Sequence, residues 1–307
     1  MNIFGKIVKR VLISVLSLFV IVTITYFLMN LMPGDPFMSE KATDQTRKVL
    51  VAKYGLDQPV YVQYGKYLSA LILHGDMGTS YVLQKGRAIR SIITEAFRVS
   101  VSIGIKALIA AILIGIPAGC MAGFFKDKLP DGMLRVISSL GISIPGYVIA
   151  AVLMVVFAVK LKILPVSYGK PGGEIMPIIV LAVGPACYII RLTRASILEV
   201  LGQDYLKTER AKGMSEARVI FIHALKNSLI PIITYIGPLT ASILTGGFVA
   251  ESVFNVPGLG RYFVNAISAR DYTLIMGVTF FYSALMILTN LICDILYQIV
   301  DPRIRID

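Results

Sequence analysis

Charged side chains are scarce in this chain of 307 residues, because Asp, Glu, Lys and Arg together make up only 16% of it. Hydrophobic residues make up 56% of the chain, whereas ordinary soluble domains contain about 45–50%. The mean hydropathy is +0.76. A soluble fold of this length could not bury so much apolar surface, but lipid solvates it. The composition therefore excludes a soluble globular protein and predicts an integral membrane protein.

Cysteine and histidine are also rare. Cys120, Cys187 and Cys293 lie inside apolar blocks and have no paired spacing, so they indicate neither a disulfide framework nor a metal site. The two histidines, His74 and His223, are far apart in the sequence and belong to no H-E-x-x-H motif. We therefore expect no bound metal and no cofactor.

A phosphate-binding loop is missing as well. Three Gly-Lys pairs occur, at residues 5–6, 65–66 and 169–170, but Ile, Tyr and Pro follow them. None has the G-x-x-x-x-G-K-[ST] spacing that holds nucleotide phosphates. We therefore expect that the chain is not an enzyme and that any ATP chemistry resides in another subunit.

The formal net charge is +12, with 30 Lys and Arg against 18 Asp and Glu. In a soluble protein this balance would raise nucleic acid as a partner. Here the basic residues lie mostly between and beside the apolar blocks, where they set membrane topology and meet anionic lipid headgroups. We expect membrane lipid, and no nucleic acid, as the partner of these charges.

Six apolar blocks are long enough to cross a hydrocarbon core, which takes about 20 helical residues. They are Val11–Leu31, Val99–Phe124, Met133–Val159, Ile175–Leu192, Leu229–Val249 and Thr273–Val300. The first block is too long for the apolar region of a signal peptide and has no A-x-A-like cleavage site. The predicted fold class is an all-α integral membrane protein with six transmembrane helices.

Basic residues in the short loops predict the topology, because the charge rule applies only to loops shorter than about 60 residues. They favour a cytoplasmic location for both termini and for the polar connection of residues 193–228. Residues 33–98 then lie outside and contain helical patterns around a turn at Gly75–Ser80, which predicts a small cap. We accordingly divide the chain into residues 1–98, the first helix with the cap, and residues 99–307, a five-helix core.

Helices two to five each contain a proline, namely Pro117, Pro145, Pro185 and Pro238. Proline is common in membrane helices and need not carry a function. Four consecutive helices with a proline nevertheless favour a bundle that bends or opens. These prolines are candidate bending points along a transport pathway.

Few ionisable residues lie inside the predicted spans. Lys106 and Asp294 lie near helix ends, where their charges reach the interface. An ion-coupled carrier usually needs ionisable groups near the middle of the membrane. A secondary carrier or channel is therefore the more remote alternative.

The inner connection contains the run Lys207-Thr208-Glu209-Arg210-Ala211-Lys212-Gly213, and its Arg210–Leu225 portion has an amphipathic helical pattern interrupted near Gly213. It resembles the cytoplasmic EAA loop of ABC importer permeases, with Lys-Thr-Glu in place of Glu-Ala-Ala. In that family the loop forms a coupling helix that docks on a separate ATP-binding subunit. The resemblance implies a coupling role for Lys207, Thr208, Glu209, Arg210, Ala211, Lys212, Gly213, Met214 and Ser215.

Four further stretches resemble the dipeptide and oligopeptide permeases of the same family. They are Met32–Pro36, Leu73–Ser80, Phe248–Gly260 and Asp301–Arg305. Each is weak alone, but they occur in the family's order from the first helix to the C-terminus.

The resemblance implies a subunit of an ATP-driven peptide importer in a bacterial inner membrane. Its expected partners are a second homologous permease, two cytoplasmic ATP-binding subunits and an extracytoplasmic substrate-binding protein. Related importers carry nickel chelates, opines or glutathione, and the residues do not distinguish these cargoes.

Overall fold

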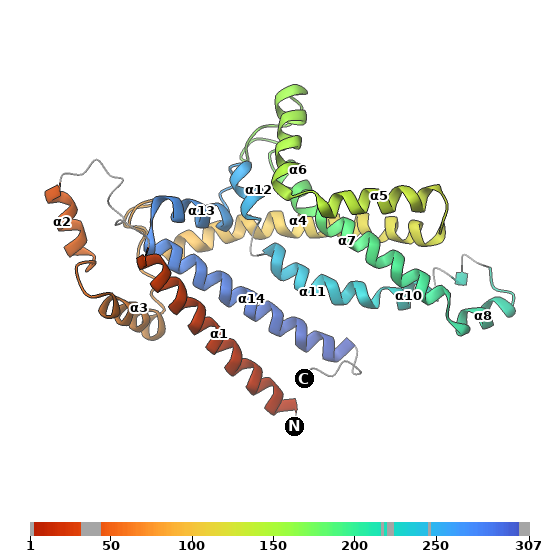
Figure 1. The fold of residues 1–307 in the computed structure, drawn as a ribbon, viewed down its shortest axis with the longest axis horizontal. Helices are drawn as coiled ribbons and strands as arrows, with labels where there is room; N and C mark the ends of the chain where they lie inside the picture. The colour runs from red at the N-terminus through yellow and green to blue at the C-terminus, as the bar shows by residue number, and fades with distance from the viewer. Residues whose placement is uncertain (1–2, 32–43, 216–217, 220–223, 245–246, 301–307) are drawn as a thin grey trace. The chain divides into compact units, whose positions relative to one another are not determined.

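The computed structural model describes residues 3–31, 44–215, 218–219, 224–244 and 247–300. The motifs Met32–Pro36 and Asp301–Arg305 lie outside these residues. The described part is built of helices (Figure 1), and its β-structure is limited to one isolated bridge between Thr79 and Ala88. The predicted all-α fold is confirmed.

Thirteen α-helices and one π-helical segment make up the described part. They are α1 (Ile3–Leu31), α2 (Asp44–Lys53), α3 (Val60–His74), α4 (Ile89–Phe124), α5 (Leu129–Ser143), α6 (Gly146–Leu153), the π-helical η1 (Met154–Lys160), α7 (Ile175–Leu201), α8 (Asp204–Ala211), α10 (Leu225–Ser228), α11 (Ile230–Leu244), α12 (Phe248–Val253), α13 (Leu259–Ala269) and α14 (Tyr272–Val300).

Five stretches in the described residues are long and apolar enough to cross a membrane, and each coincides with a predicted span. They are Lys9–Leu31, Ile89–Phe124, Ile175–Leu201, Leu225–Val253 and Tyr272–Cys293. The second starts ten residues before the apolar block, because α4 continues back through the polar stretch from Ile89. The structure thus contains five spans, and a sixth if the bent pair described next is one span.

The third predicted span, Met133–Val159, is not one continuous helix. Its two parts, Leu129–Ser143 and Gly146–Lys160, meet at an angle of 102°. Ile144 adopts an extended backbone with φ −79° and ψ 121°, as expected for a residue directly before a proline. Pro145 lacks the N–H that would continue α5, so the helix restarts at Gly146 in a new direction.

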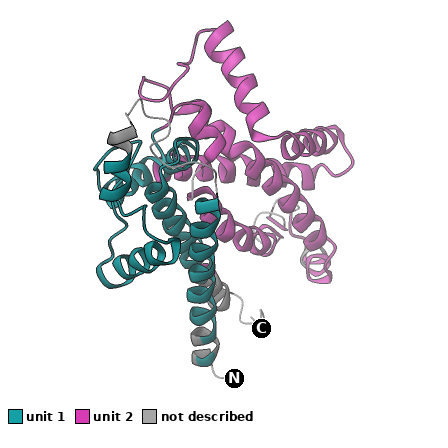
Figure 2. Cartoon of the chain, turned by 60° about the vertical axis from the view of Figure 1, so that its left-hand side comes forward, with its two compact units in different colours: residues 1–100, 257–291 teal, residues 101–256, 292–307 magenta. Residues whose placement is uncertain are grey.

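The chain divides into two compact units, which are coloured separately in Figure 2. Unit 1 comprises residues 1–100 and 257–291, and unit 2 comprises residues 101–256 and 292–307. In unit 1, α1 packs beside α14 (Figure 1) around buried Val22, Tyr26, Ile89 and Val278. This core fixes the first helix against the last span.

In unit 2, α4 packs closely on α7 through a row of glycines spaced four residues apart. A Cβ atom on Gly115 would lie 2.7 Å from Ile189 Cβ, and one on Gly119 would lie 2.5 Å from Thr193 Cβ. A Cβ atom on Gly123 would likewise lie 2.8 Å from Ile197 Cγ2. Such rows let membrane helices approach until their backbones are in contact. The α4–α7 pair is therefore the packed centre of unit 2.

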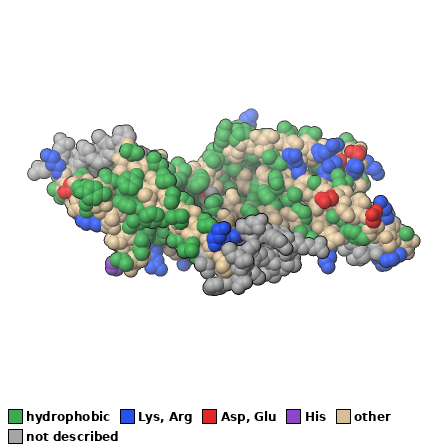
Figure 3. Space-filling view, turned by 60° about the horizontal axis from the view of Figure 1, so that its bottom comes forward, with side chains coloured by type: hydrophobic (Ala, Val, Ile, Leu, Met, Phe, Trp, Pro, Cys, Tyr) green, Lys and Arg blue, Asp and Glu red, His purple; other side chains and the backbone are tan. Residues whose placement is uncertain are grey.

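Much of the molecular surface is apolar, as Figure 3 shows for one face. Large aliphatic side chains on the spans are exposed, for example Leu12 at 64% and Leu113 at 67%. In water an apolar surface of this extent would drive aggregation, whereas in a bilayer it contacts lipid. The exposure pattern agrees with a multi-pass membrane protein.

We predict that Gly119→Ala destabilises the chain by about 1–3 kcal/mol, the usual range for overpacking a tight contact. Even a methyl group at this position would lie 2.8 Å from the Ile190 carbonyl oxygen. This oxygen belongs to the backbone of α7 and cannot easily move away. The measurement is thermal unfolding of the purified protein in detergent. Gly184→Ala on α7 is the matched control, because nothing lies within 4 Å of its added methyl. Equal unfolding midpoints for the two variants would contradict the close α4–α7 contact.

Candidate functional site

The predicted coupling residues lie on and just after α8. Asp204 begins this helix, where its carboxylate is favourable beside the positive end of the helix dipole, and its Oδ1 accepts a hydrogen bond from Lys207 Nζ at 2.8 Å. Lys207, Thr208 and Ala211 are exposed on α8. The structure describes the helical backbone of Glu209 and Arg210 and not their side chains.

The sequence pattern predicts an amphipathic helix within Arg210–Leu225. This portion is described only in part, with helical backbone at residues 218–219 and 224, so the helix stays a prediction. A separate helix, α8, spans Asp204–Ala211. Lys212 and Gly213 form the turn that ends it, and Gly213 has φ +82°, a backbone conformation that glycine adopts without strain. Residues 216–217 and 220–223 of the predicted helix are outside the described residues.

The connection has a small hydrophobic core of its own. Leu206, Val219 and Ala224 are fully buried there. The end of α7 contributes Val200 and Leu201, and the half-buried Met214 packs against the same group. Asn227 Nδ2 also donates a hydrogen bond to Tyr205 Oη at 2.8 Å. The connection is therefore a folded knob attached to the end of α7, with Lys207, Ala211, Lys212 and Ser215 exposed on it.

The candidate prolines occupy two kinds of position. Pro117, Pro185 and Pro238 lie inside the continuous helices α4, α7 and α11. Pro145 lies at the 102° break between α5 and α6. Their predicted role in bending a transport pathway stays a prediction.

A buried ion pair joins the start of α5 to α7. Asp131 is fully buried, and its two carboxylate oxygens accept hydrogen bonds from Arg194 Nε at 2.6 Å and from Arg194 Nη2 at 2.8 Å. The Asp127 amide donates to the same carboxylate at 2.9 Å, and Arg135 Nε lies 3.5 Å from it. Bidentate geometry of this kind fixes orientation as well as charge. The pair holds α5 in place on the helix that leads to the α8 knob.

Lys106, which the sequence placed near a helix end, has a partner across unit 2. Its Nζ lies 2.5 Å from Glu174 Oε2 at the start of α7. Both side chains are partly exposed, which agrees with a structural ion pair near an interface rather than with a buried ion-coupling site.

In unit 1, Asp271 organises the turn that follows α3. Its buried carboxylate accepts hydrogen bonds from Ser80 Oγ at 2.5 Å and from the amides of Tyr81, Val82 and Leu83 at 3.0–3.1 Å. A further, longer bond of 3.4 Å comes from the Leu274 amide in the first turn of α14, as in a helix N-cap. One carboxylate thus fixes residues 80–83 to the start of the last span.

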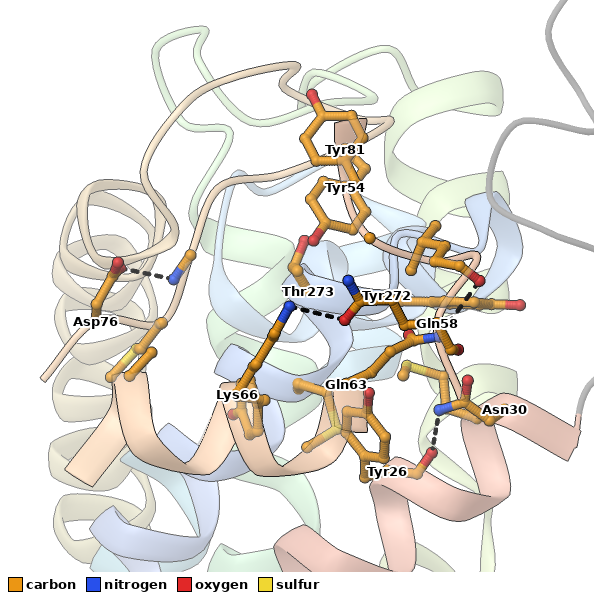
Figure 4. A pocket seen from close by; sticks show the side chains of 18 of the residues that line it. Tyr26, Asn30, Tyr54, Gln58, Gln63, Lys66, Asp76, Tyr81, Tyr272 and Thr273 are labelled. Atoms are coloured by element: carbon orange, nitrogen blue, oxygen red, sulfur yellow. Dashed lines mark hydrogen bonds between the residues drawn. The ribbon is translucent and has the colours of Figure 1, made fainter. Parts of the chain in front are cut away.

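Beside this anchor, unit 1 contains a cavity of about 450 Å³ (Figure 4). Its walls come from α1, the end of α2, α3, the turn after α3 and the start of α14, and they carry five tyrosines. Burial raises the pKa of Tyr81 to about 12 and raises that of Tyr67 further. Both phenols are therefore neutral hydrogen-bonding groups at physiological pH.

The sequence did not predict the Asp131 pair, the Asp271 anchor or the cavity. The partners of Asp131 and Asp271 lie 63 and up to 191 residues away in the chain. The one available signal was Leu73–Ser80, since this motif contains Ser80, which donates to Asp271, and Asp76, Met77 and Gly78, which line the cavity.

Comparison with known proteins gives the family. The family model for the inner membrane component of binding-protein-dependent transport systems matches residues 115–306. The corresponding model for the N-terminal part of these membrane components matches residues 3–103. The chain belongs to the family of binding-protein-dependent transport system inner membrane components. This confirms the family resemblance that the sequence motifs indicated.

Two curated relatives match over nearly their whole length. The dipeptide transport system permease protein DppB of Bacillus subtilis (strain 168) is 40% identical over 301 residues, covering 97% of each chain. The oligopeptide transport system permease protein OppB of Haemophilus influenzae is 41% identical over 302 residues, covering 97% of this chain and 98% of the relative.

A solved structure shares the fold. A chain of the MetNI methionine ABC transporter in inward-facing conformations aligns with a TM-score of 0.55 at 15% identity, covering 69% of this chain and 97% of that chain. At this identity the likeness concerns the fold alone.

We predict that Asp271→Ala destabilises the protein strongly, because it leaves the Ser80 hydroxyl and three amides without their acceptor. Each buried donor left without a partner costs about 1–3 kcal/mol. The measurement is the thermal unfolding midpoint of the purified protein. Asp204→Ala is the matched control, since the Asp204 side chain is 93% exposed and pairs with the exposed Lys207. An Asp271→Ala midpoint equal to that of Asp204→Ala would refute the anchoring role.

Proposed function

We propose that this chain is a transmembrane permease subunit of an ATP-driven importer for dipeptides or oligopeptides. The observation that carries the proposal is the 40–41% identity over nearly the full length to permeases named for dipeptide and oligopeptide transport. The long apolar spans supply the membrane part that such a subunit needs. The membrane is the inner membrane of a bacterium.

The partners follow from what the chain contains and lacks. Its sequence has no phosphate-binding loop, so two separate cytoplasmic subunits bind and hydrolyse ATP. A second homologous permease completes the pathway, and an extracytoplasmic binding protein delivers the cargo. Alternating access between the two permeases would then move the peptide across the membrane.

Coupling to the ATPases is proposed to occur at the α8 knob. Its local core packs on the end of α7, so a displacement of the knob acts directly on a 27-residue helix. Exposed Lys207 and Lys212 flank the small Ala211, and a small residue between cations suits close docking on a groove of a soluble partner. Gly213 is a poor test site, because its φ of +82° strains any side chain placed there.

We predict that both termini and residues 193–228 are cytoplasmic, whereas residues 33–98 face outward. The test uses two variants without the native cysteines, each with a single new cysteine at an exposed position, Ser69 or Ser215. Whole cells that express each variant are treated with a membrane-impermeant maleimide. Only position 69 should react before lysis, and both should react after it. Labelling of position 215 in intact cells would overturn this topology.

We predict that Ala211→Trp abolishes uptake of a labelled dipeptide by the complete importer, reducing the rate at least tenfold. The indole would separate α8 from the ATPase surface, and loss of packing at a central contact commonly costs about 2 kcal/mol or more. Co-purification of the ATPases with the variant should fall in parallel, while pairing with the second permease persists.

Ser69→Trp places the same bulk on an exposed position of α3 and should leave ATPase association unchanged. Wild-type uptake and association for Ala211→Trp would show that coupling occurs elsewhere. A wild-type importer that fails to take up any dipeptide or oligopeptide would instead disprove the peptide cargo.

A further inference from the structure

The cavity in unit 1 has the size of a small-molecule site. Its volume of about 450 Å³ lies within the range of roughly 300–1,000 Å³ of known ligand pockets. All its walls belong to the segment that the predicted topology places outside, to the outer end of α1 and to the start of α14. It lies away from the α8 knob and from the candidate prolines in sequence and belongs to neither.

The aromatic part of the wall is already ordered. The rings of Tyr26 and Tyr67 stack with centroids 5.9 Å apart and an interplanar angle of 30°. Those of Tyr54 and Tyr81 lie 4.2 Å apart. Met29, Met77 and Met276 complete the apolar lining. Rigid aromatic faces with adaptable methionines accept apolar side chains of different shape.

Both signs of charge are present on the wall (Figure 4). Lys66 Nζ donates to Gln58 Oε1 at 2.7 Å, which uses one of the three ammonium donors. Asp76 accepts the Gly78 amide at 2.8 Å through one oxygen, and its second oxygen adds further acceptor capacity. Lys53 contributes a second cation. The lysines suit a carboxylate and Asp76 suits an ammonium, so a zwitterion finds a partner for each of its charges.

Uncharged hydrogen-bonding groups also line the cavity, namely the side-chain amides of Asn30, Gln58 and Gln63. The nitrogens of Asn30 and Gln63 and the oxygen of Gln58 are already hydrogen-bonded within the protein. The oxygens of Asn30 and Gln63 and the nitrogen of Gln58 are left to pair with a peptide backbone. The Tyr67 hydroxyl is buried and has no hydrogen-bond partner among the described residues. A buried hydroxyl is unfavourable until it is paired. A ligand carbonyl would pair with it once a small shift of the Tyr67 side chain opens the hydroxyl to the cavity.

We propose that this cavity is a binding site for a short peptide with free termini, separate from the coupling site. The peptide carboxylate meets Lys66, its ammonium meets Asp76, and its side chains lie on the tyrosine faces. The inference rests on the proposed peptide cargo and adds a site on the permease itself.

The test uses the full-length chain in lipid nanodiscs, without the binding protein, titrated calorimetrically with trialanine. N-acetyl-trialanine amide, which lacks both terminal charges, should bind at least tenfold more weakly. Lys66→Ala should weaken trialanine binding at least tenfold, and Tyr67→Phe about threefold. Lys170→Ala and Tyr61→Phe are the matched controls, since both side chains are exposed and lie outside the cavity.

Equal binding of the blocked peptide, or unchanged affinity in Lys66→Ala, overturns the proposal. The proposal is also overturned if the wild-type chain does not bind trialanine although the complete importer takes it up. In that case the proposed transport function still stands. Absence of uptake of any peptide would disprove the proposed function instead. If Lys66→Ala weakens association of the binding protein and leaves trialanine affinity unchanged, the cavity wall is a protein-docking surface and the peptide site is refuted.

Discussion

The carboxylate of Asp271 is the acceptor on which the turn at residues 80–83 of unit 1 depends. It accepts hydrogen bonds from the Ser80 hydroxyl and from three consecutive amides of residues 81–83. Asp271 itself directly precedes α14. A run of amides pointing at one anion is an arrangement that neutral side chains reproduce poorly. Because the turn is fixed in this way, the Tyr81 ring lies tilted against the Tyr54 ring, and Thr273 Oγ1 donates to the Thr79 carbonyl oxygen at 2.6 Å. The part of the cavity wall around Tyr81 thus depends on the anchor.

Unit 2 is organised by packing rather than by a single charge. The glycine row of α4 brings its backbone against α7, and a bidentate ion pair fixes the start of α5 to the same helix. Van der Waals contact and satisfied polar groups are the forces available in lipid, where the hydrophobic effect between helices is absent. Each of these contacts uses α7, which makes this helix the common support of the unit.

The sequence predicted the spans because long apolar runs are local and are sufficient to identify membrane helices. It also predicted helical patterns around a turn at Gly75–Ser80, and α3 (Val60–His74) ends directly before that turn. The break at Pro145 and the intact helices around Pro117, Pro185 and Pro238 could not be distinguished, because all four prolines lie in similar apolar contexts. Tertiary packing decides whether a freed carbonyl is accommodated within the helix or the helix breaks.

Features that depend on distant residues escaped prediction for a different reason. In the sequence, Asp271 is a single acidic residue before a span. No neighbouring residue indicates that the amides of residues 81–83 donate hydrogen bonds to it. The cavity combines single residues from several segments of the chain, none of which has a binding motif of its own. Likewise the local core of the inner connection joins Leu206 on α8 to Val219 and Ala224, which lie further along the chain and share no motif with it.

The placement of the α8 knob bears on how coupling would reach the membrane. Its core includes Val200 and Leu201, which belong to the last turn of α7, and α7 continues without a break to Ile175. A rigid helix carries a displacement along its axis, while a flexible linker would absorb it. Along its length α7 meets the glycine row of α4 and the Arg194–Asp131 pair. A movement imposed at α8 would therefore act on α4 and α5 through α7, because these close contacts cannot deform much. The knob itself needs no direct contact with α4 or α5 to move them.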